Sequence, residues 1–169
     1  MANQSVLNSI PDNTSFLQTT RFTFVIPQLP FLKYFCQTVL LPGVSTTEAL
    51  VPTPFSDTYR HGDKLVYDPL SITTLVDEDL RVFEETYQWL SYLTNPIRFG
   101  EFKQKFTEKY YDGVLTVNTN SNIPNMRIKF RNCHPVTLGS VQFATTDTAD
   151  ITPVFDVTFR YDIYQIERL

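Results

Sequence analysis

The chain has 169 residues, of which 42% are hydrophobic, 14% aromatic and 19% charged, so it can bury a core and is not a disordered tail. Threonine, valine and isoleucine are abundant and alanine is rare, which favours β-sheet and argues against a helical bundle. A net charge of -4 argues against a protein whose main role is to grip nucleic-acid phosphates. No stretch approaches the roughly 20 apolar residues of a membrane span, so we expect a single intracellular domain with no membrane partner.

The chain opens with a polar stretch. Residues 1–18 lack apolar periodicity and predict an N-terminal arm, followed by one domain over residues 19–169. Arg21–Ile26 alternates in the manner of a strand, and residues 33–41 predict a second strand that ends at the Pro42-Gly43 turn. These two strands are expected to form a hairpin or to lie side by side.

Residues 44–68 form an excursion that is too long and too apolar for an ordinary connection. We expect a projecting hairpin with a turn at His61-Gly62-Asp63, whose apolar side chains need another surface. Folding back over the same domain is equally compatible with the sequence. The residues assigned to the proposed contact are Leu50, Val51, Phe55, Tyr59, His61, Gly62 and Asp63.

Residues 70–76 predict a strand with Ser71 and Thr73 on its polar side. The period then changes, and residues 78–94 predict an amphipathic helix with Asp77 as its N-cap. The expected buried face is Leu80, Phe83, Tyr87 and Leu90, and the expected outward face includes Glu84, Glu85 and Gln88.

The last third of the chain is strand-like throughout. Residues 113–119, 126–131, 141–145 and 154–166 predict strands, with a chain turn at His134-Pro135. In the final run the expected core face holds Phe155, Val157, Phe159, Tyr161 and Ile163, and the polar face holds Asp156, Thr158, Arg160, Asp162 and Tyr164. The predicted fold class is mainly β (α+β), a β-sandwich or partial barrel with one flanking helix and a long projecting hairpin.

The usual motifs of catalysis are absent. The sequence contains no GxSxG, HExxH or GxxxxGK[ST] pattern, and Cys36 and Cys133 stand far apart. The acidic run Asp77-Glu78-Asp79 is explained better as a helix N-terminus than as a catalytic pair. We therefore expect no enzyme activity, no cofactor and no metal site.

A basic ladder is the main charge pattern. Arg127, Lys129 and Arg131 alternate with apolar residues, which places three cations on one face of a strand. The ladder can serve as a subunit interface, a solvated face or a nucleic-acid contact, but three cations are too few to hold a duplex by counterion release.

A series of landmarks runs along the chain in a recognisable order. They are RFTFVI from Arg21, YFCQ from Tyr34, LPGV from Leu41, GDKL from Gly62, VDED from Val76, Trp89, Pro135 and the closing strand Phe155–Tyr164. In their order and spacing the chain resembles the tail tube protein family of T-even-type contractile phages, and the similarity spans Arg21–Leu169. No single landmark is diagnostic; their order and spacing carry the resemblance.

The resemblance implies a structural virion protein whose subunits form hexameric rings with a continuous lumenal β-barrel. The rings stack into a tube through the hairpin, and genomic DNA passes through the lumen without specific binding. It further implies contacts with the tail sheath protein, with baseplate and tail-terminator proteins and with a tape measure protein inside the lumen. The expected location is the phage tail of the virion, after assembly in the host cytoplasm.

A passage for DNA favours a neutral or acidic lining, because DNA carries about one negative charge per 1.7 Å of its axis. The residues expected to face the lumen are Ser71, Thr73, Asp156, Thr158 and Asp162. Arg127, Lys129 and Arg131 are then expected to face outward or into a subunit contact, and Glu84, Glu85 and Gln88 to face the sheath.

Three other functions stay open at this stage. A tube-like baseplate protein that initiates the tube and the inner tube of a bacterial contractile injection system share the expected fold. A soluble β-barrel that binds a small ligand belongs to a different class and would be monomeric.

Overall fold

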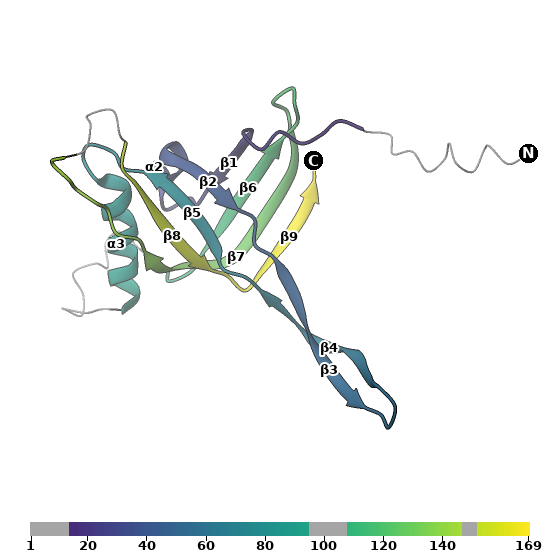
Figure 1. Ribbon diagram of the computed structural model, residues 1–169. Helices are drawn as coiled ribbons and strands as arrows, with labels where there is room; N and C mark the ends of the chain where they lie inside the picture. Colours follow the sequence, from purple (N-terminus) through teal and green to yellow (C-terminus); the bar gives the residue numbers. More distant parts are fainter. Residues whose placement is uncertain (1–13, 95–107, 147–151) are drawn as a thin grey trace, which may run out of the picture.

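The computed structural model describes residues 14–94, 108–146 and 152–169 (Figure 1). These residues form a mainly β structure with two helices, which confirms the predicted class. Residues 1–13 of the predicted arm lie outside the described part, and Ser15–Leu17 are exposed. The strands are β1 (Phe22–Val25), β2 (Cys36–Leu40), β3 (Val44–Pro52), β4 (Asp57–Tyr67), β5 (Leu70–Leu75), β6 (Tyr111–Asn118), β7 (Pro124–Leu138), β8 (Val154–Arg160) and β9 (Ile163–Arg168), and the helices are α2 (Pro30–Phe35) and α3 (Arg81–Thr94).

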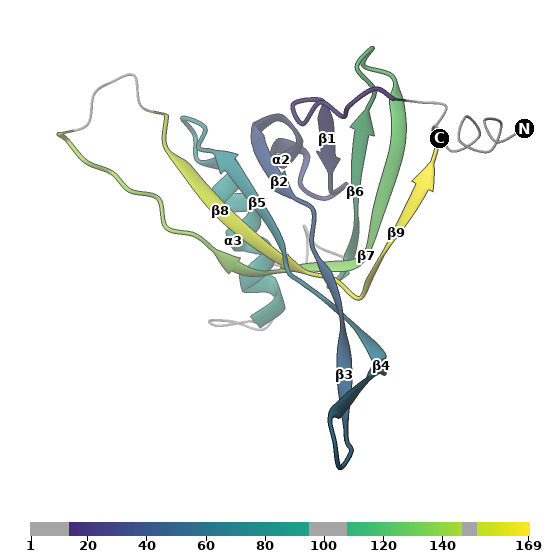
Figure 2. The same cartoon turned by 45° about the vertical axis from the view of Figure 1, so that its right-hand side comes forward.

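Strand β7 joins two halves of one sheet. Its first half lies between β6 and β9, and its second half pairs with β8, which continues through β5 to β2. Asn132 adopts a positive φ of 56° between the two halves, a conformation that asparagine tolerates better than most residues. Figure 2 shows the two halves diverging from β7, with β1 beside β6 at the end of one half and α2 lying between β1 and β2. The result is a partial barrel whose end strands, β1 and β2, are not paired with each other.

The predicted chain turn at His134-Pro135 is wrong. The chain continues as β7, with His134 opposite Arg160 and Pro135 opposite Phe159. Proline fits there because no described strand pairs with the other edge of this part of β7, so no amide hydrogen is needed. Residues 141–145 are not a strand either.

The predicted strand over residues 33–41 is a helix followed by a strand. Pro30 stands in the first turn of α2, where its fixed φ favours the helix, and Leu32 is 1% exposed. Strand β2 begins directly after this helix at Cys36 and pairs with β5.

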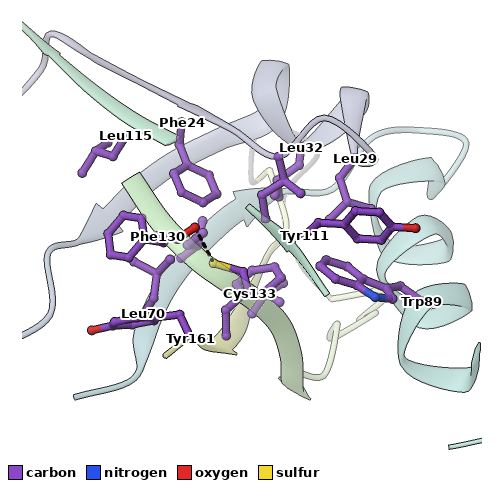
Figure 3. Packing of buried hydrophobic residues seen from close by; sticks show 14 of the residues in the cluster. Phe24, Leu29, Leu32, Leu70, Trp89, Tyr111, Leu115, Phe130, Cys133 and Tyr161 are labelled. Atoms are coloured by element: carbon purple, nitrogen blue, oxygen red, sulfur yellow. Dashed lines mark hydrogen bonds between the residues drawn. The ribbon is translucent and has the colours of Figure 1, made fainter. Parts of the chain in front are cut away.

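The hydrophobic core lies between the two halves of the sheet and under α3 (Figure 3). Trp89 of α3 is fully buried, with its ring centroid 5.3 Å from that of Tyr111 and 6.0 Å from that of Phe159. Phe83 packs edge-on against Phe155 at 5.5 Å. Helix α3 therefore covers one face of β8 and leaves the opposite face uncovered by any described helix.

Helix α3 begins at Arg81, three residues after the predicted start at residue 78, and Asp77 caps it as predicted. The Asp77 carboxylate accepts hydrogen bonds from the backbone N–H groups of Arg81 at 3.0 Å and Val82 at 3.3 Å. Leu80 adopts a positive φ of 54° just before the first turn. These bonds satisfy amides that have no partner inside the helix.

The predicted buried face of this helix is partly wrong. Val82, Thr86 and Trp89 are buried, whereas Tyr87 is 48% exposed. The large indole of Trp89 occupies the core and donates a hydrogen bond from Nε1 to the Lys109 carbonyl at 3.2 Å, which turns the helix about its axis. Glu85, expected on the outer surface, is consequently buried.

The predicted final strand is two strands with a corner at Tyr161-Asp162. Up to the corner the expected alternation is confirmed, since Phe155, Val157 and Phe159 are buried. Beyond it the alternation reverses, because Tyr164 packs against the core while Ile163 is 39% exposed.

Candidate assembly surfaces

The excursion between residues 44 and 67 is a hairpin that projects away from the sheet (Figure 1). Strands β3 and β4 pair with each other and with no other described strand. Nearly all of their residues are exposed, with Phe55 at 99% and Tyr59 at 67%. The alternative arrangement, in which the excursion folds back over its own domain, is therefore wrong.

Four of the seven predicted contact residues gather at the end of the hairpin but do not share one face. Leu50 lies opposite Tyr59 on one face, Val51 lies opposite Thr58 on the other, and Phe55 stands in the connection between the strands. We call Leu50, Val51, Phe55 and Tyr59 the hairpin tip. Apolar side chains so exposed are typical of a surface that another protein covers.

His61, Gly62 and Asp63 do not form the predicted turn. They lie within β4, where the pairing register shifts between Thr46 and Glu48. Gly62 faces Thr47, and a Cβ at this position would collide with the Thr47 carbonyl oxygen. The glycine therefore permits a β-bulge that divides the hairpin into a root section and a tip section.

Strands β5 and β8 each have one face toward the core and one face away from it. The face away from the core carries four of the five residues expected to face a lumen. Ser71 lies opposite Thr158 and Thr73 opposite Asp156, with the Thr73 hydroxyl donating to Asp156 Oδ1 at 2.6 Å. We call these four residues the polar face. Thr38 on β2 and Thr137 on β7 extend it to both sides.

Asp162, the fifth expected residue, lies at the β8–β9 corner instead. Its carboxylate accepts a hydrogen bond from Asn132 Nδ2 at 2.5 Å, and its N–H donates to the Arg131 carbonyl at 3.0 Å. Asp162 is thus separated from the polar face because the final strand bends after Arg160.

The basic ladder lies on the other half of the sheet. Lys129 Nζ stands 2.9 Å from Glu167 Oε1, and Arg131 Nη2 donates to Gln165 Oε1 at 3.0 Å, both across the β7–β9 pair. The hydrogen bond from Lys129 holds the pKa of the Glu167 carboxyl below its ordinary value. Because Glu167 also lies opposite Arg127, the ladder is partly neutralised within the chain.

Two of the three residues expected on the outward face of α3, Glu84 and Gln88, do lie on that face. Gln88 Nε2 donates to Glu84 Oε1 at 2.8 Å, a contact one helical turn apart. Glu84 is exposed and Gln88 half-buried, so this face is open to a partner, unlike the buried Glu85.

The described residues offer little for catalysis or metal binding. No group of three or more His, Cys, Asp and Glu side chains among them is placed to hold a metal ion. Burial raises the pKa of the Cys36 thiol to about 11 and that of Cys133 to about 12, so both stay protonated at neutral pH. None of the helices in the described part is long and apolar enough to cross a membrane.

Sequence reasoning missed the corner between β8 and β9 and the contacts that it makes. Tyr161 and Tyr164 converge there on Tyr67 at the root of the hairpin. The only local signal is Asp162 itself, because aspartate is uncommon in strands. The alternation of apolar and polar residues continues through this position, so it did not reveal the corner.

Comparisons with known proteins agree with these features. A family model described as "Phage tail tube protein" matches residues 5–167. The tail tube terminator protein of Enterobacteria phage T4 is 28% identical over 156 residues, which cover 89% of this chain and 88% of that protein.

Two solved structures share the fold over nearly the whole chain. The anti-feeding prophage cap, described as a tube terminating cap, has a TM-score of 0.65 at 13% identity and covers 100% of both chains. The PVC sheath/tube terminator of an extracellular contractile injection system has a TM-score of 0.61 at 15% identity and covers 92% of this chain and 99% of that chain. The family match confirms the resemblance at the level of the family: this chain belongs to the phage tail tube protein family.

Proposed function

We propose that this chain is a tail tube terminator, a structural protein that forms a ring at the end of a phage tail tube. The observation that carries the proposal is the similarity to the phage T4 terminator over 89% of this chain and 88% of that protein. The likeness to the tube terminating cap adds support at the level of the fold. We therefore replace the expected role of tube subunit with that of the ring that ends the tube.

The free edges of the sheet support closure into a ring. Among the described strands, β2 has one unpaired edge, and so has β7 beyond Cys133. Pairing β2 of one copy with this edge of β7 in the next copy would continue the half-sheet β7-β8-β5-β2 around a hexameric ring, with at most one hydrogen bond missing at Pro135, which has no N–H group. Closure would leave no free edge in this half-sheet and would produce a continuous lumenal barrel.

In such a barrel we assign the polar face to the lumen. Ser71, Thr73, Asp156 and Thr158 lie opposite the side that α3 covers, and these four residues present hydroxyls and one acid. The next residue on this side of β8 is a cation, Arg160, whose Nη1 donates to the Tyr67 carbonyl at the root of the hairpin. One cation is too few to hold DNA by its phosphates. Arg127, Lys129 and Arg131 lie on the other half-sheet and are assigned to the outer side or to a subunit contact; a bore lined by these cations would refute the assignment.

The remaining surfaces define the proposed partners. The hairpin tip would contact a neighbouring ring of the tube, and the polar side of α3 at Glu84 and Gln88 would face the sheath. Genomic DNA and a tape measure protein would occupy the lumen, and baseplate proteins would lie at the far end of the tube. The proposed location is the virion tail, with assembly in the host cytoplasm.

Negative-stain microscopy of the purified chain, alone and mixed with tubes grown from the tube protein of the same phage, tests the proposal. We expect discrete rings alone, and one ring at a tube end that stops further growth. Long hollow tubes from this chain alone would make it the tube subunit. A strictly monomeric chain that ignores tube ends would overturn both roles and favour a ligand-binding barrel.

A further inference from the structure

We propose that the β8–β9 corner is a positioning element that fixes the direction in which the β3–β4 hairpin projects from the sheet. The hairpin root consists of Pro42–Val44 on one strand and Tyr67–Asp68 on the other. The proposal rests on the function proposed above in one respect, which is that the hairpin tip contacts a neighbouring subunit.

Three side chains from the corner hold the root by its backbone. The Tyr161 hydroxyl donates to the Asp68 carbonyl at 2.9 Å, and the Tyr164 hydroxyl donates to the Pro42 carbonyl at 3.5 Å. Arg160 Nη1 donates to the Tyr67 carbonyl at 3.3 Å. The corner therefore binds the chain both where it enters the hairpin and where it leaves it.

Aromatic packing connects the same root to the core. The Tyr67 ring meets those of Tyr161 and Tyr164 edge-on, with centroids 5.9 and 5.5 Å apart. Tyr161 in turn packs at 5.1 Å against Phe130, which is fully buried (Figure 3). Edge-to-face pairs at these distances are favourable and directional, so the root is attached to the rigid part of the protein.

The two chain segments of the root are also hydrogen-bonded to each other. The Asp68 N–H donates to the Gly43 carbonyl at 3.1 Å, and a Cβ at Gly43 would lie only 2.8 Å from Asp68 Oδ2. With the root held in this way, the bulge at Gly62 is the first place along the hairpin where its direction can change. The corner thus sets the direction of the root section, and the bulge sets that of the tip.

A fixed direction has a consequence for assembly. A hairpin that already points at its partner loses less conformational freedom on contact than one that swings, which favours binding. The Tyr161 hydroxyl keeps its hydrogen bond to the Asp68 carbonyl over a wide pH range, since burial raises the pKa of Tyr161 to about 12 and leaves it protonated as a donor.

The test compares the full chain with a Tyr161→Phe/Tyr164→Phe variant, which retains both rings and removes both donors. Nitroxide labels at Ser56→Cys in the tip and Glu84→Cys on α3, with Cys36→Ser to remove the half-buried native thiol, report the direction of the hairpin by pulsed electron spin resonance. We expect a narrow distance distribution in the parent and one at least twice as broad in the variant. Tyr87→Phe, on the exposed side of α3, is the matched control and should leave the distribution narrow.

A second readout is the fraction of tube ends that carry a ring, which should fall several-fold in the double variant and stay unchanged in the control. An unchanged distance distribution in the variant overturns the proposal. A broad distribution with undiminished end binding overturns the positioning role. If the parent itself ignores tube ends, the function proposed above fails, and the distance distributions still decide whether the corner fixes the hairpin. Should the double variant fold poorly, Arg160→Gln removes one exposed donor in its place.

Discussion

Replacing Phe55 with aspartate isolates the contact made by the hairpin tip. Phe55 is 99% exposed in the single chain, so Phe55→Asp should change the free energy of unfolding by less than about 0.5 kcal/mol, the usual range for surface substitutions. If a neighbouring subunit buries this ring, each contact gains about 1.5–3 kcal/mol from it, the value of a fully buried phenylalanine. Losing that gain weakens each contact by roughly 10- to 150-fold, since about 1.4 kcal/mol is a factor of ten.

Two measurements on the same preparation check this expectation. Thermal unfolding should be unchanged, and negative-stain counts of ring-capped tube ends should fall to background. Phe143→Asp is the matched control, because Phe143 is 76% exposed but belongs to the connection between β7 and β8, which lies far from the hairpin (Figure 1), and this variant should cap tubes normally. Normal capping by Phe55→Asp would refute the assignment of the tip as a contact surface.

Three further substitutions test local interactions. Asp77→Ala removes the cap of α3 and should lower the free energy of unfolding by about 1 kcal/mol in urea titrations, whereas Asp77→Asn should recover most of the loss. Gly62→Ala places a methyl group against Thr47 and should speed amide exchange in β3 and β4 with little change in β5 and β8; protected hairpin amides would contradict the bulge. Lys129→Met should raise the pKa of Glu167 toward its ordinary value in an NMR titration, and an unmoved midpoint would contradict the ion pair. Because the pKa of Glu167 is lowered in the folded chain, its contribution to stability is present above the unfolded-state pKa and disappears as the pH falls through the folded-state pKa.

Local patterns in the sequence determined much of the fold. The strand class follows from the abundance of β-branched residues, and the core faces of β5 and of β8 up to Phe159 follow from simple alternation. The cap at Asp77 is equally local, because it depends on amides within five residues of the carboxylate. The exposed apolar tip of the hairpin was foreseeable as a stretch in need of a partner, but its projection was not, since the sequence fitted a folded-back arrangement equally well.

Tertiary structure decided the features that depend on distant neighbours. Glu85 is buried because the Trp89 indole packs against Tyr111 and Phe159 and so determines which side of the helix faces the core. The periodicity of apolar residues along the helix does not predict this choice of side. The predicted chain turn at His134-Pro135 is instead part of one continuous strand, because β7 pairs with β6 and β9 before this point and with β8 after Asn132. The reversal of alternation after Tyr161 has the same origin, because a corner is stabilised by the long-range contacts that form around it and leaves little trace in the residues on either side.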